Sequence, residues 1–481
     1  MDKRSLGTLG ISLIPILVLI ALLALDIGIF GSDAILGASQ VSLLFSAGIA
    51  IWLAMWLFKV PWKDFEEAIK NNIGDVTSAI VILFLIGAIS GTWTISGIVP
   101  TFIYYGVKII SPKIFLFAAC LICALVSLMV GSSWTTIATI GVALLGIGKA
   151  EGFSDGLIAG AIISGAYFGD KISPLSDTTV MASSINRVPL FDHIRYMLFT
   201  TVPSITITLI IFLVLGLSHS GTDSSTITEY TQALAGRFRI TPWLLIVPVL
   251  TAFMIFRKMP ALIVLALSVL MAAVFAVIFQ QGNVLEIGSG VTEGAKWKVL
   301  FSGVVETAYN TVSLPTGNPD VDQLVTTRGM AGMLNTVFLI ICAMCFGASM
   351  RASGMLRNIS TIIIPLTRKR GGMVASTVAT GTALNGIVSD QYLSIILTSN
   401  IFKDIYEKEG YESRLLSRAV EDSATVTSPL YPWSSCGMTQ ATILSVPTLT
   451  YLPFCFFNII SPFMSIIIAL TGYKVVRAIK K

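Results

Sequence analysis

The chain has 481 residues, of which 54% are hydrophobic and only 12% are charged, and its formal net charge is +5. This composition excludes an ordinary soluble globular protein, and apolar blocks long enough to cross a bilayer recur from end to end. Lys and Arg cluster between these blocks, which indicates membrane orientation and argues against nucleic-acid binding. We therefore predict an all-α polytopic membrane protein with about 11–13 membrane spans.

The first apolar block, residues 9–30, is long enough to span and lacks a small-residue cleavage site, so we expect a retained first helix. A second span at 41–58 is followed by an interfacial segment at 59–70, whose three Lys we place on the cytoplasmic side. The apolar stretch from 114 to 147 is interrupted by Gly131-Ser-Ser-Trp-Thr-Thr136. Such an interruption is typical of a broken or re-entrant helix that lines a cavity.

The most unusual stretch comes next, Gly165-Ala-Tyr-Phe-Gly-Asp-Lys-Ile-Ser-Pro-Leu-Ser-Asp-Thr-Thr179. It follows an apolar, glycine-rich segment and gathers charged and hydroxyl side chains around Pro174, which an unbroken membrane helix does not easily accommodate. In lipid, such a run is either a surface loop or a site.

The remaining apolar blocks predict spans at 76–99, 196–217, 243–256, 261–279, 333–350, 374–388, 393–401, 441–457 and 459–471. The interval between 281 and 332 is polar and is expected outside the cell. The chain ends in a basic segment at 474–481, so we expect both termini on the cytoplasmic side.

Two polar interruptions occur at matching places in the two halves. Ser133 precedes Asp170 by 37 residues, and Ser389, within the break Asn385-Gly-Ile-Val-Ser-Asp-Gln-Tyr392, precedes Asp422 by 33. Each of these Asp residues is followed by Ser-Pro-Leu. Paired interruptions of this kind predict two inverted repeats, with the site at the midplane between them.

We divide the chain accordingly into three parts. Residues 1–217 form an N-terminal half with the first repeat, residues 218–332 form a connecting region with two spans and an external segment, and residues 333–481 form a C-terminal half with the second repeat.

Carboxylates within such a bundle are costly by a few kcal/mol and should be paired, protonated or bound to a cation. A carboxylate whose proton is displaced by Na+ couples two ions through one site, and hydroxyl and carbonyl oxygens are the ligands that an alkali cation prefers. The residues predicted to bind the cation or proton are Asp170, Asp177, Asp390, Asp422, Ser133 and Thr135, with Asp170 as the principal carboxylate and the Na+ site. The residues predicted to contact a substrate are Ser132, Thr136, Ser173, Asn385, Ser389 and Gln391.

Each candidate also has a structural alternative. Asp177 could simply cap a helix. Lys171 is favoured as a salt-bridge partner that keeps Asp170 ionised, and Asp422 could be a charge on a cytoplasmic helix face. Half-helix N-termini at the breaks could instead hold a substrate carboxylate.

An enzyme is disfavoured, because no His-Glu-x-x-His, Gly-x-Ser-x-Gly or phosphate-loop motif is present and His193 and His219 are the only histidines. The pairs Cys120/Cys123 and Cys342/Cys345 lie in apolar helices without further metal ligands, so we interpret them as packing residues.

The stretch from Ser164 to Thr179, with Asp192-His-Ile-Arg195 beyond it, closely resembles the signature of the NhaC family of Na+/H+ antiporters, including its malate/lactate antiporter branch. Three blocks of the second half are also similar to that family: Ser389-Asp-Gln-Tyr-Leu-Ser394, Leu416-Ser-Arg-Ala-Val-Glu-Asp-Ser423 and Pro447-Thr-Leu-Thr-Tyr-Leu-Pro453. The chain departs from the family pattern at Ser389, where relatives carry Gly, and at 132–136, where Gly-Thr-Ser-Trp-Gly is commoner. Both departures fall at the predicted site.

The resemblance implies the fold of the ion-transporter superfamily, with two inverted repeats and broken helices, commonly assembled as a homodimer. It implies a secondary transporter of the cytoplasmic membrane that exchanges Na+ for H+ by alternating access and needs no cofactor. Some members also carry malate, lactate or amino acids, so a Na+-coupled organic-acid or amino-acid transporter is the alternative.

Overall fold

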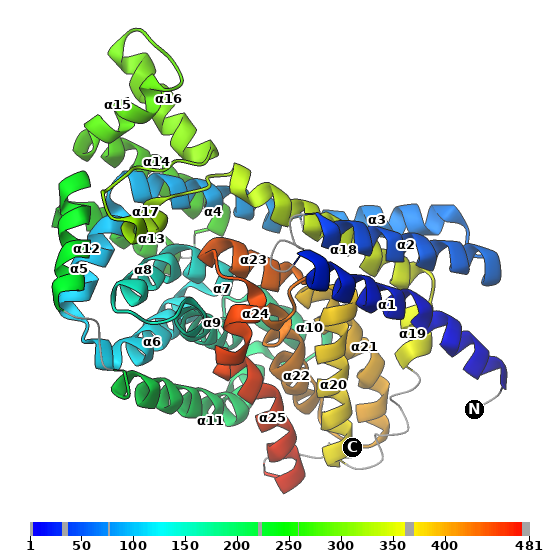
Figure 1. Cartoon of the computed structure of the whole chain (residues 1–481). Coiled ribbons are helices and arrows are strands. Elements are labelled where there is room, and N and C mark those ends of the chain that lie inside the picture. Colours follow the sequence, from blue (N-terminus) through cyan, green and yellow to red (C-terminus); the bar gives the residue numbers. More distant parts are fainter. Residues whose placement is uncertain are drawn as a thin grey trace.

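The computed structural model describes residues 3–30, 37–75, 77–219, 224–257, 259–360 and 370–473. Within these ranges the chain is built from helices (Figure 1), and an isolated antiparallel β-bridge joins Val312 to Thr327. The basic segment at 474–481, on which the predicted position of the C-terminus depends, lies outside the described residues.

Seven helical segments of the described ranges are long and apolar enough to cross a membrane. They lie in α1 (Lys3–Phe30), α2 (Ala38–Leu57), α6 (Pro112–Val130), α7 to α8 (Ser133–Ala150), α11 (Leu190–Leu217), α14 (Ala261–Phe279) and η4 to α18 (Ala331–Ala352).

Three bent helix pairs raise this number to as many as ten. These pairs join α4 (Thr77–Ile95) to α5 (Ile98–Ile109), α12 (Ser224–Arg237) to η3 (Pro242–Leu245) with α13 (Ile246–Phe256), and α24 (Thr448–Tyr451) with η8 (Leu452–Phe454) to α25 (Phe456–Thr471). A span beyond ten has to come from a shorter or more polar helix. The predicted class, a polytopic helical protein with broken helices, is confirmed.

The first repeat contains the first predicted break. Helix α6 ends at Gly131, whose left-handed backbone (φ 72) suits glycine, and a Cβ there would lie 2.7 Å from the backbone of Leu175. The chain restarts at α7 (Ser133–Thr136) and continues through the π-helical η2 (Ile137–Gly141) into α8 (Val142–Ala150). The break therefore lies where the sequence predicted it.

Helix α9 (Asp155–Ile172) then packs along α6. A Cβ at Gly165 would overlap the carbonyl oxygen of Cys120, and a Cβ at Gly169 would overlap that of Ala124, so these glycines allow close helix contact. After a turn through Ser173-Pro-Leu, the repeat closes with α10 (Asp177–Ile185).

The second repeat follows the same order of elements. Helix α20 (Arg370–Val388) ends at Ser389, which has a φ of 58, and α21 (Gln391–Lys408) begins after it. Helix α22 (Ser413–Val420) continues as the π-helical η6 (Glu421–Thr425), and η7 (Ser428–Leu430) leads to α23 (Ser435–Leu444).

The structure aligns the two breaks differently from the sequence comparison, which matched Ser133 with Ser389. Gly131 and Ser389 are the left-handed residues of the two breaks, and Ser132 and Asp390 are the helix caps that follow them. Ser389 therefore corresponds to Gly131 and not to Ser133, because backbone conformation defines the match. An L-residue in the left-handed region is strained, which explains why glycine suits this position.

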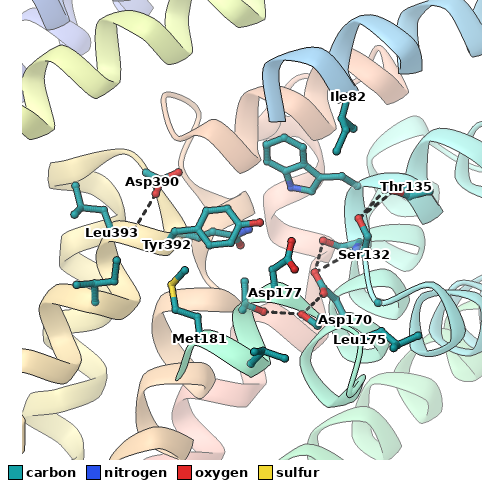
Figure 2. A pocket seen from close by; sticks show the side chains of 18 of the residues that line it. Ile82, Ser132, Thr135, Asp170, Leu175, Asp177, Met181, Asp390, Tyr392 and Leu393 are labelled. Carbon is teal, nitrogen blue, oxygen red and sulfur yellow. Dashed lines mark hydrogen bonds between the residues drawn. The ribbon is translucent and has the colours of Figure 1, made fainter. Parts of the chain in front are cut away.

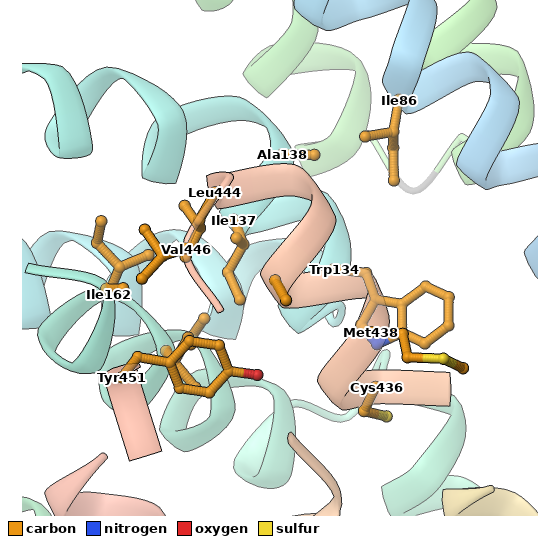
Figure 3. Close-up of a cluster of buried hydrophobic side chains, with 14 of the residues drawn as sticks. Ile86, Trp134, Ile137, Ala138, Ile162, Cys436, Met438, Leu444, Val446 and Tyr451 are labelled. Atoms are coloured by element: carbon orange, nitrogen blue, oxygen red, sulfur yellow. The ribbon is translucent and has the colours of Figure 1, made fainter. Parts of the chain in front are cut away.

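Buried apolar side chains from both repeats form the core between them (Figure 3). Ile137 and Ile162 of the first repeat meet Leu444, Val446 and Tyr451 from the region of α23 and α24.

The other helices surround this pair of repeats. Helices α1, α2, α3 (Trp62–Asp75), α18 (Leu334–Ala352) and α19 (Met355–Ser360) lie together on one side (Figure 1). On the other side, α15 (Gln281–Ser289) and α16 (Lys296–Tyr309) form a hairpin that projects from the body, and α17 (Pro319–Val325) follows it.

Candidate functional site

A cavity of about 910 Å³ lies between the two breaks (Figure 2). It is lined by α7, by the turn before α10 and α10 itself, by the start of α21, and by parts of α3, α4, α14 and α18. Seven of the predicted site residues line it: Ser132, Ser133, Thr135, Asp170, Asp177, Asp390 and Gln391. Residues from both repeats thus face a single space.

Asp170, near the end of α9, accepts three hydrogen bonds. Its Oδ2 accepts from the backbone nitrogen of Ser133 at 3.2 Å and from the Ser133 hydroxyl at 2.7 Å, and its Oδ1 accepts from the Ser176 hydroxyl at 2.7 Å. Asp170 is only 5% exposed. Donors that converge on a buried carboxylate stabilise negative charge there, which is what a cation site requires.

Asp177 and Asp390 both line the cavity, and Asp390 is the one that caps a helix. Asp177 is the first residue of α10 and lines the cavity, and the cap of that helix is Ser176. Asp390 is the cap of α21 and accepts from the Leu393 backbone nitrogen at 2.9 Å. The Ser435 hydroxyl donates to the other oxygen of Asp390 at 3.2 Å. The interpretation of Asp177 as the helix cap is therefore wrong.

Hydroxyl and amide oxygens complete the polar wall. Ser132 caps α7, and its hydroxyl accepts from the backbone nitrogen of Thr135 at 3.2 Å and from the Thr135 hydroxyl at 3.1 Å. Gln391 accepts from the Ser428 hydroxyl at 3.3 Å through its side-chain oxygen. These are hard oxygen ligands of the kind that Na+ prefers, and they stand close to the carboxylates.

Five predicted site residues do not line the cavity: Thr136, Ser173, Asn385, Ser389 and Asp422. The first four form hydrogen bonds with backbone groups at the breaks or on the helices beside them. The Thr136 hydroxyl donates to the Ser132 carbonyl at 2.9 Å, and the Ser173 hydroxyl donates to the Leu128 carbonyl at 2.8 Å.

Asn385 donates to the Ala424 carbonyl at 2.7 Å, and the Ser389 carbonyl accepts from the Ser435 nitrogen at 2.8 Å. Residue type and spacing placed these side chains at the breaks, but they do not give the direction in which each side chain points.

Asp422 lies deeper, in a fully buried ion pair with Lys171. Lys171 also donates to the Ser461 hydroxyl at 3.0 Å, and the Thr200 hydroxyl donates to Asp422 at 3.0 Å. The predicted pairing of Lys171 with Asp170 is thus wrong, because consecutive helix residues point in different directions and only Asp170 faces the cavity. Asp422 is likewise not a charge on an exposed helix face.

Two residues of this buried region were missed from the sequence, Arg418 and Glu421. The spacing of Arg418 four residues before Asp422 is a signal that could have identified it, and Arg418 Nε does lie 3.9 Å from Asp422 Oδ2. Glu421 has no such signal, because its position follows from the π-helical turn that begins with it.

Comparison with known proteins relates this chain to transporters. Residues 5–186 and 165–473 match the model of the Na+/H+ antiporter family. The chain is 38% identical over 420 residues to the Na+/H+ antiporter NhaC of Alkalihalophilus pseudofirmus, which covers 87% of each chain. It is 36% identical to the malate-2H+/Na+-lactate antiporter of Bacillus subtilis, over 90% of this chain and 89% of that one. It is 33% identical to the arginine/ornithine antiporter ArcD of Halobacterium salinarum, over 98% of this chain and 94% of that one.

Proposed function

Because the chain belongs to the Na+/H+ antiporter family, we propose that it exchanges Na+ for H+ by alternating access, with Asp170 as the carboxylate for which the two ions compete. Membership of this family makes it a multi-pass secondary transporter of Na+ and H+, and not an enzyme. The observation that supports Asp170 is its position: a buried carboxylate that faces the cavity and accepts three hydrogen bonds from the break and the turn.

Competition follows from the charge of this small site. When Na+ binds Asp170, the hydroxyls of Ser133 and Ser176 can rotate so that their oxygens face the cation, since a hydroxyl both donates and accepts. When a proton binds Asp170, the carboxyl becomes neutral and a cation loses its main attraction. Each ion therefore excludes the other, which links the transport of one to the transport of the other.

The two walls of the cavity support alternating access. Asp170, Ser133 and Asp177 come from the first repeat, while Asp390 and Gln391 come from the second. Movement of one repeat against the other would separate these walls and open the site to the other side of the membrane. We propose the corresponding division into a half at 1–217, a connecting region at 218–332 and a half at 333–481.

The assembly and orientation are proposals of the same kind. A position in the cell membrane with both termini cytoplasmic is supported by the basic segments between the spans. A homodimer is supported by the apolar outer face of α2, where Phe45, Trp52 and Trp56 are exposed. Chemical crosslinking in native membranes, combined with accessibility labelling of single cysteines near each terminus, tests both points.

A second candidate function is favoured by Arg351 in the cavity wall. Na+ needs a shell of a few oxygens, whereas a cavity of about 910 Å³ lies in the range of sites for organic ligands. Arg351 of α18 donates to the side chain of Asn72, and within the described ranges no carboxylate lies within 4 Å of its guanidinium. A small carboxylate or amino acid carried with Na+ could pair with it, as the names of the malate/lactate and arginine/ornithine relatives suggest.

Proteoliposomes that contain a pH-sensitive dye test the primary function. A Na+ gradient imposed across the membrane should drive proton movement in the opposite direction, and this movement should be lost in Asp170→Asn. Counterflow of labelled malate, lactate or arginine, measured with and without Na+, tests the second candidate. Organic counterflow with no Na+-driven proton movement would replace the primary function by the second.

A further inference from the structure

Five ionisable side chains are buried together behind the cavity. Lys171, Arg418, Glu421 and Asp422 are fully buried, and Asp170 is 5% exposed. They come from the two repeats, since Asp170 and Lys171 end α9 while the other three belong to α22 and η6. Charges in such surroundings are stable only as neutral combinations, because an uncompensated buried charge costs several kcal/mol.

Asp422 is the carboxylate that the cations and hydroxyls of this cluster surround. It pairs with Lys171, accepts from the hydroxyls of Thr200 at 3.0 Å and Ser461 at 3.4 Å, and lies 3.9 Å from Arg418. Two cations and two hydroxyl donors stabilise its charged form.

Glu421 is the opposite case. Both of its carboxylate oxygens are enclosed, and neither forms a hydrogen bond within the described part of the chain; the Thr425 hydroxyl of the same turn interacts with it electrostatically but is itself unbonded. The Arg418 guanidinium does not serve it: this group stacks over the Tyr196 ring, 4.6 Å from its centroid, and approaches Asp422. A buried carboxylate without donors is far less costly as a neutral acid than as an anion.

The charge count of the cluster supports a single bound proton. With all five groups ionised, three carboxylates face two cations and one negative charge is in excess. One proton makes the cluster neutral: on Glu421 it leaves Asp170 charged and ready for a cation, and on Asp170 it excludes the cation. If Na+ then binds Asp170, the cluster is neutral only once Glu421 has lost its proton. Glu421 interacts electrostatically with Lys171, Asp170 and Asp422, so it is near enough to respond.

We propose that Glu421 is a second ion site of this transporter, a proton-binding carboxyl that releases its proton when Na+ occupies Asp170 and regains it when Na+ leaves. In the release step the O–H bond of Glu421 breaks, the carboxylate keeps the electron pair and the proton passes to water. The π-helical turn at Glu421 is consistent with this role, because such turns are frequent at functional sites.

Other titratable groups lie on the elements packed against η6. They are Asp170 and Lys171 of α9, Arg414 and Arg418 of α22, Asp422 of η6 itself, Asp177 of α10, and Tyr392, Lys403, Asp404, Tyr406, Glu407 and Lys408 of α21. Helix α11, which bonds to Asp422 through Thr200, adds the buried His193, whose Nδ1 lies 2.8 Å from the Ser417 hydroxyl, and Tyr196 under the Arg418 guanidinium. Helix α25 has no ionisable residue, and the one in α20 is Arg370, at the far end of that helix from Ser389. Compared with these groups, Glu421 is distinguished by complete burial together with two carboxylate oxygens that form no hydrogen bond.

The test is proton release on Na+ binding to the purified, weakly buffered protein, followed with a pH dye in parallel with binding of 22Na+. The wild type should release protons as Na+ binds. In Glu421→Gln, Na+ should still bind, more weakly and with little dependence on pH, and proton release should be lost. Without the carboxylate of Glu421, protonation of Asp170 would leave an excess positive charge, so Asp170 stays ionised.

Glu409→Gln is the matched control, because this exposed residue follows α21 outside the cluster and should release protons as the wild type does. Unchanged proton release per Na+ in Glu421→Gln would overturn the inference. Failure of this variant to fold would also overturn it, because glutamine has nearly the shape of the neutral acid that we infer. The inference rests on the proposed function, and the two failures are distinguishable: Na+ binding that survives in Asp170→Asn contradicts the proposed Na+ site, whereas unchanged proton release in Glu421→Gln contradicts only the role of Glu421.

Discussion

Ser133 donates two hydrogen bonds to the same oxygen of Asp170, from its backbone nitrogen at 3.2 Å and from its hydroxyl at 2.7 Å. The first residue of α7 is thereby joined to the last turn of α9, 37 residues further along the chain. The broken helix does not merely leave space for an ion. It supplies the groups that hold the principal carboxylate in position.

Ser133→Ala removes the hydroxyl and leaves the backbone donor. Because a hydrogen bond to a charged group contributes about 1.5–3 kcal/mol, the apparent affinity for Na+ in transport assays should fall roughly tenfold or more. Ser183→Ala is the control, since the Ser183 hydroxyl bonds within α10 to the Val180 carbonyl and does not line the cavity. An unchanged Na+ dependence in Ser133→Ala would show that the hydroxyl does not support the site.

Lys171→Met should destabilise the protein strongly. It leaves the buried carboxylate of Asp422 without its closest cation, and breaking a buried ion pair costs about 3–5 kcal/mol. Adding Asp422→Asn should recover part of the loss. Thermal unfolding in detergent measures both effects, and Lys149→Met, which removes a partly exposed ion pair with Asp155, should change little. Equal effects of the two Met substitutions would argue against the buried pair.

Ser389→Gly should stabilise the second break. Ser389 has a φ of 58, a conformation that costs an L-residue about 1–2 kcal/mol, and the gain is reduced by the greater freedom of glycine in the unfolded chain. We expect a net gain of up to about 1 kcal/mol in thermal unfolding. Ser389→Ala keeps the strain and should give no such gain. A destabilising Ser389→Gly would mean that the hydroxyl has a role that its buried, unpartnered position does not indicate.

Arg351→Gln separates the two candidate functions. If a carboxylate is carried, its counterflow should fall by at least tenfold, because a charge-assisted pair is lost, while Na+-driven proton movement continues. Parallel measurement of both activities in the same proteoliposomes checks this. Loss of both activities together would instead assign Arg351 a structural role through Asn72.

Glu151, in the turn after α8, predicts a pH dependence of stability. Burial raises the pKa of its carboxyl from 4.5 to about 7, and neither oxygen has a hydrogen-bond partner within the described ranges. The folded state therefore holds a proton that the unfolded state has lost, so this contribution is complete below pH 4.5 and disappears as the pH rises through 7. Thermal unfolding between pH 5 and 8 should show this loss, and Glu151→Gln should reduce it. An unaltered pH profile in that variant would contradict the assignment.

Much of the architecture could be predicted from the sequence, because lipid restricts the backbone to helices and because polar interruptions at Gly131 and Ser389 are conspicuous in apolar surroundings. Seven of the twelve predicted site residues line the cavity. Those that do not, such as Asn385 and Thr136, were chosen by residue type and position, and their side chains bond to backbone carbonyls instead.

The remaining features depend on directions that a linear pattern does not contain. Lys171 follows Asp170 directly, but it points to Asp422, 251 residues away, and not into the cavity. Glu421 is placed by a π-helical turn, which no periodicity in the sequence announces.

The most direct test of the account is binding of 22Na+ to purified protein carrying Asp170→Asn, with Asp155→Asn as the matched control. Asp155 lies at the other end of the same helix and away from the cavity. We predict that Asp155→Asn binds Na+ as the wild type does and that Asp170→Asn shows no saturable binding. Saturable Na+ binding of unchanged affinity in Asp170→Asn would contradict the central claim.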